Sequence, residues 1–121
     1  MIGHLVLFNP KPDATTGQLR SFARAISDAC RQIPSISHVQ VGRHVSIDAG
    51  YLRSFGDKTY EYAAIFEFRD AEALKEYINH PLHHELGRMF WEICESTTVV
   101  EVELTNGTSD QLVDFLLSDR K

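Results

Sequence analysis

Cysteine is scarce in this chain, and long hydrophobic runs are absent. Only Cys30 and Cys94 occur among the 121 residues, and because they stand at no metal-ligand spacing we expect neither a disulfide framework nor a cysteine metal site. Nowhere do about 18 uncharged apolar residues follow one another, and the chain enters a strand-like segment at Gly3 with no basic flank and apolar stretch before it. The expectation is a cytoplasmic protein with reduced thiols and no membrane partner.

Positive charge is also in short supply. The chain has 12 lysines and arginines against 17 aspartates and glutamates, a formal net charge of −5, and the basic residues are scattered along it. Because nucleic-acid binding depends on basic patches, a nucleic-acid partner is not expected. Hydrophobic residues make up 43% of the chain, which is enough for one buried core at this length. A single globular unit is therefore predicted.

The spacing of apolar residues predicts three helical regions. Apolar residues follow helical spacing from Leu19 until Pro34, and Thr15 with Gln18 forms the sequence pattern of a capping box. Asp70 is a suitable N-cap for a second helical region, which is broken at Asn79-His80-Pro81 and then resumes. A last helix is expected over residues 108–117.

Alternation of side chains predicts four strands, over residues 3–8, 36–45, 59–68 and 97–104. In the third of these, Tyr60 and Tyr62 are expected on the same face. Residues 46–58 contain glycines and aspartates and are expected to form a loop, whose apolar side chains pack over another part of the protein. The element order is therefore βαββαβ, with a split second helix and an added third.

This order is that of a ferredoxin-like α+β domain, an antiparallel sheet with helices on one face. The strands nevertheless carry apolar residues on both faces, with Leu5 and Leu7 on one side of the first strand and Val6 and Phe8 on the other. Leaving such a face in water costs roughly 25 cal/mol per Å² of apolar surface. A second copy of the chain would cover it, so we expect a homodimer in which two sheets form a dimeric α+β barrel.

Histidine is abundant, and three of the six histidines lie between Tyr77 and His84. The segment Tyr77-Ile78-Asn79-His80-Pro81-Leu82-His83 resembles the stress-responsive A/B barrel domain family, whose members are dimeric α+β barrels. Other matching parts are His4 in the first strand, Ile33-Pro34 and Val41-Gly42. The resemblance covers residues 1–104, which it identifies as one stress-responsive A/B barrel domain, and leaves residues 105–121 as a C-terminal helical extension.

The resemblance implies a pocket with a tyrosine and a histidine, because one enzyme of the family, a plant polyketide cyclase that closes a ring by aldol condensation, uses such a pair. The matching residues here are Tyr77 and His83. An imidazole titrates near neutral pH and is suited to removing a proton next to a carbonyl, while a phenol stabilises the enolate oxygen. His4 is shared with that cyclase, but Tyr62 stands where it has a further pocket histidine, which argues against the same substrate.

Two other interpretations of the histidine segment stay open. In the first, His80 and His83 cap and join two helical pieces and bond to backbone groups that the break at Pro81 leaves unpaired. In the second, His80 with His84, or His83 with an acidic neighbour such as Glu85, ligates a metal, but Pro81 disturbs the helical spacing and no third ligand is suitably placed. No metal or other cofactor is therefore expected.

Two functions follow from these observations. One is a homodimer of no assigned activity whose central cavity binds a small apolar or aromatic molecule. The other is an enzyme of cyclase or lyase type, with His83 as general base and Tyr77 beside it, acting on a carbonyl or polyketide-like substrate. The residues expected to bind the ligand are His4, Phe8, Tyr62, Phe66, His80 and Phe90.

Overall fold

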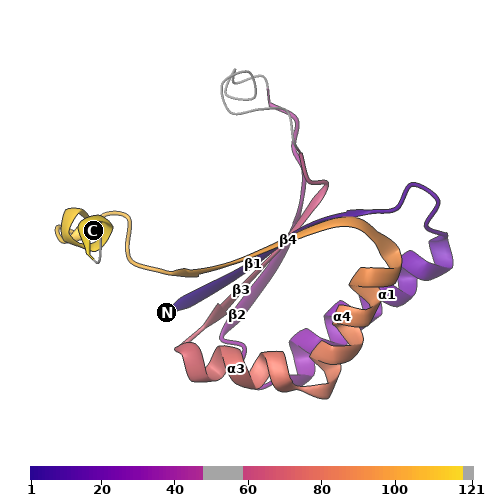
Figure 1. Cartoon of the computed structure of the whole chain (residues 1–121), viewed down its shortest axis with the longest axis horizontal. Helices are drawn as coiled ribbons and strands as arrows, with labels where there is room; N and C mark the ends of the chain where they lie inside the picture. The colour runs from indigo at the N-terminus through magenta and orange to yellow at the C-terminus, as the bar shows by residue number, and fades with distance from the viewer. Residues whose placement is uncertain (48–58, 119–121) are drawn as a thin grey trace.

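The computed structural model describes residues 1–47 and 59–118 and confirms the predicted order of elements (Figure 1). Most of the predicted loop at 46–58 lies outside the described residues. The strands are β1 (Ile2–Pro10), β2 (His38–Arg43), β3 (Tyr62–Phe68) and β4 (Cys94–Glu103). The helices are α1 (Thr16–Gln32), α3 (Ala71–Asn79), α4 (Pro81–Ile93) and α5 (Leu112–Leu117).

The four strands form one antiparallel sheet in the order β2-β3-β1-β4. Helices α1, α3 and α4 lie against one face of this sheet, which we call the helix side (Figure 1). No described helix packs against the opposite face, which we call the open face. This is the ferredoxin-like arrangement, with β1 and β3 in the centre and β2 and β4 at the edges, so the predicted fold class of the chain is confirmed.

The helices begin where the sequence provides side-chain caps. The N–H of Gln18 donates to the Thr15 hydroxyl oxygen over 3.1 Å, and the N–H of Thr15 donates to Gln18 Oε1 over 2.9 Å, which completes the predicted capping box. Asp70 Oδ1 accepts from the N–H of Ala73 at the start of α3. Each such cap stabilises a helix by about 1 kcal/mol, and together they fix where α1 and α3 start against the sheet.

Aromatic side chains on the helix side form much of the core. Phe8 of β1 and Phe66 of β3 are buried there. The ring of Phe8 meets those of Phe22 in α1 and Phe90 in α4 edge to face, with centroids 5.7 and 5.1 Å apart. Such pairs add to the energy of burying their large apolar area. This cluster fixes α4 relative to β1, and that relation shapes the site described below.

The open face is apolar at its centre, as predicted. Leu5 of β1 lies between Ile65 of β3 and Val100 of β4 in the strand register. Ile65 and Val100 are each 41% exposed. Leu7 and Val102 have the same parity and belong to the same face. The described part of a single chain therefore leaves a connected apolar area exposed on this face.

The prediction that Tyr60 and Tyr62 share a face was wrong. Tyr62 belongs to β3 and faces the helix side, whereas the Tyr60 hydroxyl is hydrogen-bonded to the hydroxyl of Thr98 on the open face of β4. Alternation fails here because β3 begins only at Tyr62. Just before β3 begins, the N–H of Glu61 donates to the side-chain Oδ1 of Asn9 in β1. A side-chain hydrogen bond therefore stands where a backbone bond between the two strands would otherwise form.

Two element boundaries also differ from expectation. The last helix starts at Leu112 instead of residue 108, because Asn106 Oδ1 accepts both the N–H and the hydroxyl of Thr108, at 2.9 and 2.8 Å, and holds a turn there. The fourth strand was expected from residue 97 but begins at Cys94, whose N–H caps α4 by donating to the carbonyl of Phe90.

Candidate functional site

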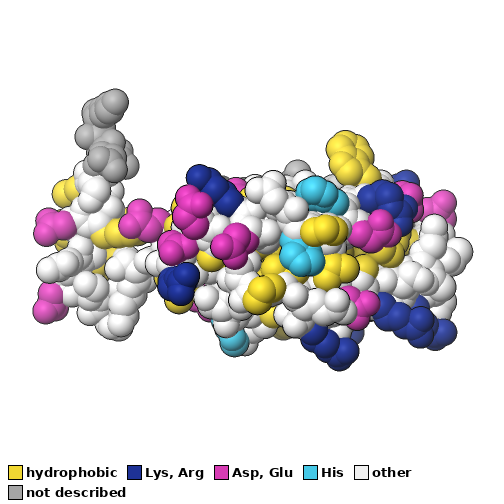
Figure 2. Space-filling view, turned by 90° about the horizontal axis from the view of Figure 1, so that it is seen from below, with side chains coloured by type: hydrophobic (Ala, Val, Ile, Leu, Met, Phe, Trp, Pro, Cys, Tyr) yellow, Lys and Arg dark blue, Asp and Glu magenta, His cyan; other side chains and the backbone are white. Residues whose placement is uncertain are grey.

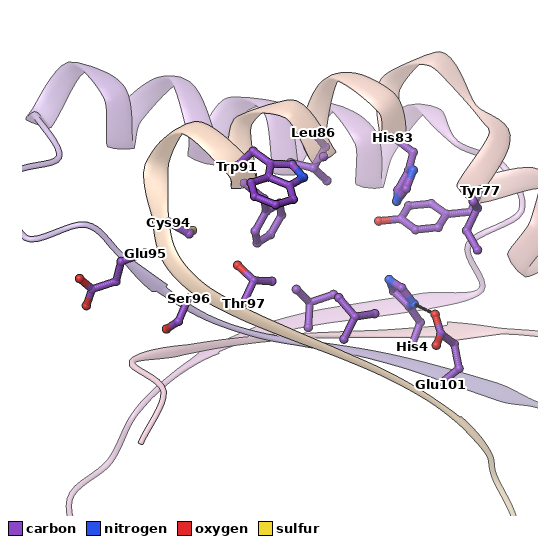
Figure 3. A pocket seen from close by; sticks show the side chains of 15 residues that line it. His4, Tyr77, His83, Leu86, Trp91, Cys94, Glu95, Ser96, Thr97 and Glu101 are labelled. Atoms are coloured by element: carbon purple, nitrogen blue, oxygen red, sulfur yellow. Dashed lines mark hydrogen bonds and ion pairs between the residues drawn. The ribbon is translucent and has the colours of Figure 1, made fainter. Parts of the chain in front are cut away.

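A cleft of about 510 Å³ opens between the helix side of the sheet and helices α3 and α4 (Figure 3). It exists because edge strand β4 has little helix cover: Thr97 and Val99 face the cleft, and Val99 stays 48% exposed. Leu86, Phe90 and Trp91 of α4 form the opposite wall. The cleft is thus mainly apolar and lies within one chain, while a central cavity between two copies stays a prediction.

Three of the predicted site residues meet at one end of this cleft. The ring centroids of His4 and Tyr77 are 5.6 Å apart, and those of Tyr77 and His83 are 4.6 Å apart. His4 comes from β1, Tyr77 from α3 and His83 from α4, and Figure 3 shows the three rings around the same space. The break at Pro81 left open whether Tyr77 and His83 meet, and the structure brings them into contact.

His4 is oriented by an acidic partner across the sheet. Its Nδ1–H donates to Glu101 Oε1 over 3.0 Å, and the two residues lie directly opposite each other in β1 and β4. Because Nδ1 carries the proton, Nε2 of the neutral ring is left as an acceptor. Burial lowers the pKa of His4, and the Glu101 carboxylate only partly offsets this effect. His4 therefore presents a neutral, oriented imidazole to the cleft.

Tyr77 is held by aromatic packing. Its ring lies 5.2 Å from the rings of both Phe66 and Phe68, and only 2% of the residue is exposed. Burial raises the pKa of its phenol far above the usual range, so the hydroxyl keeps its proton. Figure 3 shows that hydroxyl pointing into the cleft. Tyr77 is thus a fixed hydrogen-bond donor for a group bound there.

His83 reaches the cleft from the first turn of α4. Burial lowers the pKa of its ring, with His4 and His84 acting in the same direction and the backbone carbonyl of Ile78 opposing them. Its Nδ1 is buried and makes no hydrogen bond of good geometry to the described residues. Since Nδ1 is out of reach, Nε2 is the atom that meets a ligand. The result is a second neutral imidazole facing the first.

His80 binds the backbone instead. Its Nδ1 accepts a hydrogen bond from the N–H of Leu82 over 3.1 Å, which caps α4 with Pro81 in the first turn. This is the capping role considered for the segment, and it applies to His80 but not to His83. The cap ends α3 and starts α4 in one step, and so brings Tyr77 and His83 to the same cleft.

The other predicted ligand-binding residues divide into two groups. Phe90, like His4, lines the cleft. Phe8, Tyr62, Phe66 and His80 do not. Phe8 and Phe66 are buried in the core and covered by neighbouring aromatic rings. The ring of Tyr62 stacks on that of Phe8, with centroids 5.5 Å apart, and His80 caps α4. Strand parity placed Phe8, Tyr62 and Phe66 on the correct face. Phe8 and Phe66 are nevertheless buried in the core, and the half-buried Tyr62 packs on Phe8 outside the cleft.

Most residues that line the cleft were not predicted, and Glu101 and Trp91 are the two most informative of them. Glu101 could have been found from its alternation with Val99 and Thr97, since that parity places it on the helix side of the sheet. Trp91 is 87% exposed although it lies at the rim of an apolar cleft. No sequence signal marks it, because an apolar residue in an amphipathic helix is normally expected in the core.

Metal and thiol chemistry find little support in the described part of the chain. No three histidine, cysteine, aspartate or glutamate side chains converge there. Burial raises the pKa of both Cys30 and Cys94, which keeps the thiols protonated. None of the described helices is long and apolar enough to cross a membrane.

The fold and cleft define a ferredoxin-like domain, and several solved structures share it. A protein of Arabidopsis thaliana is 20% identical with a TM-score of 0.73, over 90% of this chain and 100% of that one. A dimeric protein of unknown function from Bacteroides fragilis is 27% identical with a TM-score of 0.62, over 85% and 95%. The hydroxynitrile lyase of Passiflora edulis is 17% identical with a TM-score of 0.69, over 89% and 95%.

The family is shown by sequence. The model of the stress-responsive A/B barrel domain matches residues 2–104, which include the whole sheet and α1, α3 and α4. The chain therefore belongs to the stress-responsive A/B barrel domain family, as the resemblance predicted. Residues 105–121, which contain α5, lie outside the match. No curated protein matches the chain.

Proposed function

We propose that the protein is a homodimer in which each subunit binds a small, uncharged apolar or aromatic molecule in the cleft. The observation that carries this proposal is a mainly apolar space with His4, Tyr77, His83 and Glu101 gathered at one end, while Glu95, Ser96 and Thr97 of β4 lie toward the other. Small-molecule sites have this composition and a volume of about 300–1,000 Å³. The polar end would hold one carbonyl or hydroxyl group, and the apolar remainder would lie along α4 and β4.

The charges around the cleft favour an uncharged ligand. Glu95 and Glu101 are among the described residues that line it, and none of those residues is a lysine or arginine. Both histidines are neutral because burial lowers their pKa. A carboxylate would therefore meet negative charge and no cation. Trp91, exposed at the rim, adds a flat apolar surface on which an aromatic ring would stack.

The dimer is supported by the open face and by relatives. Leu5, Ile65 and Val100 form the centre of an apolar face that no described helix covers, and a two-fold pair would bury one such face against the other. Structural neighbours from Bacteroides fragilis and Thermobifida fusca, at 27% and 20% identity, are described as dimeric. A cytoplasmic location for the dimer accords with its reduced, protonated thiols.

Acetophenone is expected to bind more tightly than benzoate, by about tenfold or more, because the two differ little except in charge. An amide NMR titration of each compound measures both affinities and shows which residues respond. Val99→Phe should fill the cleft and abolish binding. Val41→Phe, the same change at a 53% exposed strand position away from the cleft, should leave binding unchanged. Equal binding to all variants would place the ligand elsewhere.

A proton-transfer enzyme is the second candidate function. It is favoured by the contact between Tyr77 and His83, which places a phenol donor beside a neutral base. Nε2 of His83 would take a proton from the carbon next to a bound carbonyl, and the Tyr77 hydroxyl would donate to the enolate oxygen that forms. The Passiflora edulis neighbour is a lyase, so one protein with this fold is an enzyme.

Deuterium exchange of the acetophenone methyl group tests this chemistry without knowledge of the natural substrate. In D2O the protein should accelerate exchange. The rate should rise with pH and reach its plateau at a lower pH than a free imidazole would, because burial lowers the pKa of His83. His83→Ala should reduce the rate by about 100-fold or more. His84→Ala, the neighbouring histidine outside the cleft lining, is the control. Exchange unaffected by His83→Ala would rule out this base.

A further inference from the structure

The C-terminal segment 105–118 stands apart from the rest of the chain. Figures 1 and 2, two perpendicular views, both show it beyond the end of the sheet, joined to the domain by a narrow connection. Its helix α5 carries Val113, Leu116 and Leu117, which are 65%, 62% and 60% exposed. No described element packs extensively against α5. We call residues 105–118 the arm.

The arm owes its form to bonds within itself. Asn106 Oδ1 holds Thr108, the N–H of Gln111 donates to the hydroxyl of Ser109, and the hydroxyl of Ser118 donates to the carbonyl of Asp114. These local bonds set the direction of α5 but bury none of its apolar side chains. A helix of six residues is far too short to be stable in water by itself. The arm therefore requires a surface on which to pack.

We propose that the arm packs the apolar side chains of α5 against a second copy of the chain. This inference rests on the homodimer proposed above and extends its interface. The open face of β4 is continuous with the arm: Val100 and Val102 face the expected partner, and Leu104, whose N–H donates to the carbonyl of Met1, is the last residue tied to the sheet. The chain thus enters the arm directly from the interface, already directed away from its own domain.

Two-fold symmetry accounts for both arms at once. Each copy supplies one arm and one surface on which the partner's arm packs. Val113, Leu116 and Leu117 are therefore covered in both copies. The turn that Asn106 holds directs the arm away from its own domain, so packing on that domain would require this turn to change. An unrelated protein partner would have to be present at matching amounts to keep α5 ordered, whereas a second copy always is.

Sedimentation velocity over a dilution series tests the arm. A chain ending at residue 104 is expected to dissociate at concentrations at least about tenfold higher than the full chain, equivalent to about 1.4 kcal/mol. The full-length variant Val113→Ser, Leu116→Ser, Leu117→Ser should show the same loss, and it avoids any effect of truncation on the fold. A variant with three exposed polar arm positions changed, Thr105→Ser, Asp110→Ser and Gln111→Ser, should dissociate as the unmodified chain does.

The outcomes separate the arm from the dimer itself. If the full chain dimerises and all variants dissociate alike, the arm inference is overturned while the homodimer stands. A full chain that is monomeric at all concentrations overturns both. If the serine variant lowers the Tm of the monomer but leaves dimerisation unchanged, α5 packs on its own domain and the inference is again wrong.

Discussion

Replacing Ile65 and Val100 together by aspartate is expected to convert the proposed homodimer into a folded monomer. The two residues flank Leu5 on the open face, and each is 41% exposed in the single chain, so the new carboxylates meet water unless a second copy covers them. Between two packed sheets they would be buried without partners, at a cost of several kcal/mol. The dissociation constant should rise by roughly a thousandfold or more. Sedimentation velocity measures this change.

Val41→Asp is the matched control for this variant. Val41 is a strand valine that is 53% exposed, but it lies on the helix side of edge strand β2, so a carboxylate there should affect neither the fold nor dimerisation. Circular dichroism should show the same helix and strand content for both variants. A double aspartate variant that dimerises as tightly as the unmodified chain would show that another surface forms the dimer.

Tyr77→Ala is expected to lower the free energy of unfolding by about 3–5 kcal/mol. The side chain is 2% exposed and contacts the rings of Phe66, Phe68, His4 and His83, so its removal leaves a cavity among aromatic groups that cannot close over it. Total stabilities of small domains are about 5–15 kcal/mol, which makes this one of the largest losses a single substitution here could cause. Urea unfolding followed by circular dichroism measures it.

Tyr77→Phe separates the packing of this residue from its role in the cleft. The phenyl ring keeps all the aromatic contacts, so the free energy of unfolding should change by less than about 1 kcal/mol. Loss of the hydroxyl should weaken acetophenone binding by about five- to tenfold, because the carbonyl loses a donor. A phenylalanine variant that binds acetophenone as tightly as the unmodified protein would show that the phenol takes no part in binding.

Much of the fold could be predicted because its signals are local. Capping residues such as Thr15 and Asp70 bond within three residues of themselves, and strand parity places Val6, Phe8 and Phe66 on the helix side without knowledge of the partners. At two of the places where the observed structure departs from the expected one, a side chain replaces a backbone bond. Asn9 at Glu61 and Asn106 at Thr108 are both such cases, and spacing of apolar residues does not reveal them.

The site was harder to predict because it depends on distance between elements. The resemblance supplied His4, Tyr77 and His83, and the fold brings them together. The pairing of His4 with Glu101, 97 positions away, depends on the register of β1 against β4. Likewise, whether Phe66 or Phe90 borders the cleft depends on how far α4 extends over the sheet. Residue patterns give the face of an element, but not which part of that face the neighbouring helix leaves uncovered.

The side chains of strand β4 alternate between the cleft and the open face. Thr97, Val99 and Glu101 face the cleft, while Thr98, Val100 and Val102 face away from the helices. Because successive side chains alternate, inserting or deleting one residue in this strand would exchange the two sets. Substitution at Thr97 or Val99, by contrast, changes the shape of the cleft while the buried aromatic core stays intact. Under the proposed function, single substitutions on this one edge strand would therefore be enough to change which ligand the cleft prefers, provided that the length of the strand is kept.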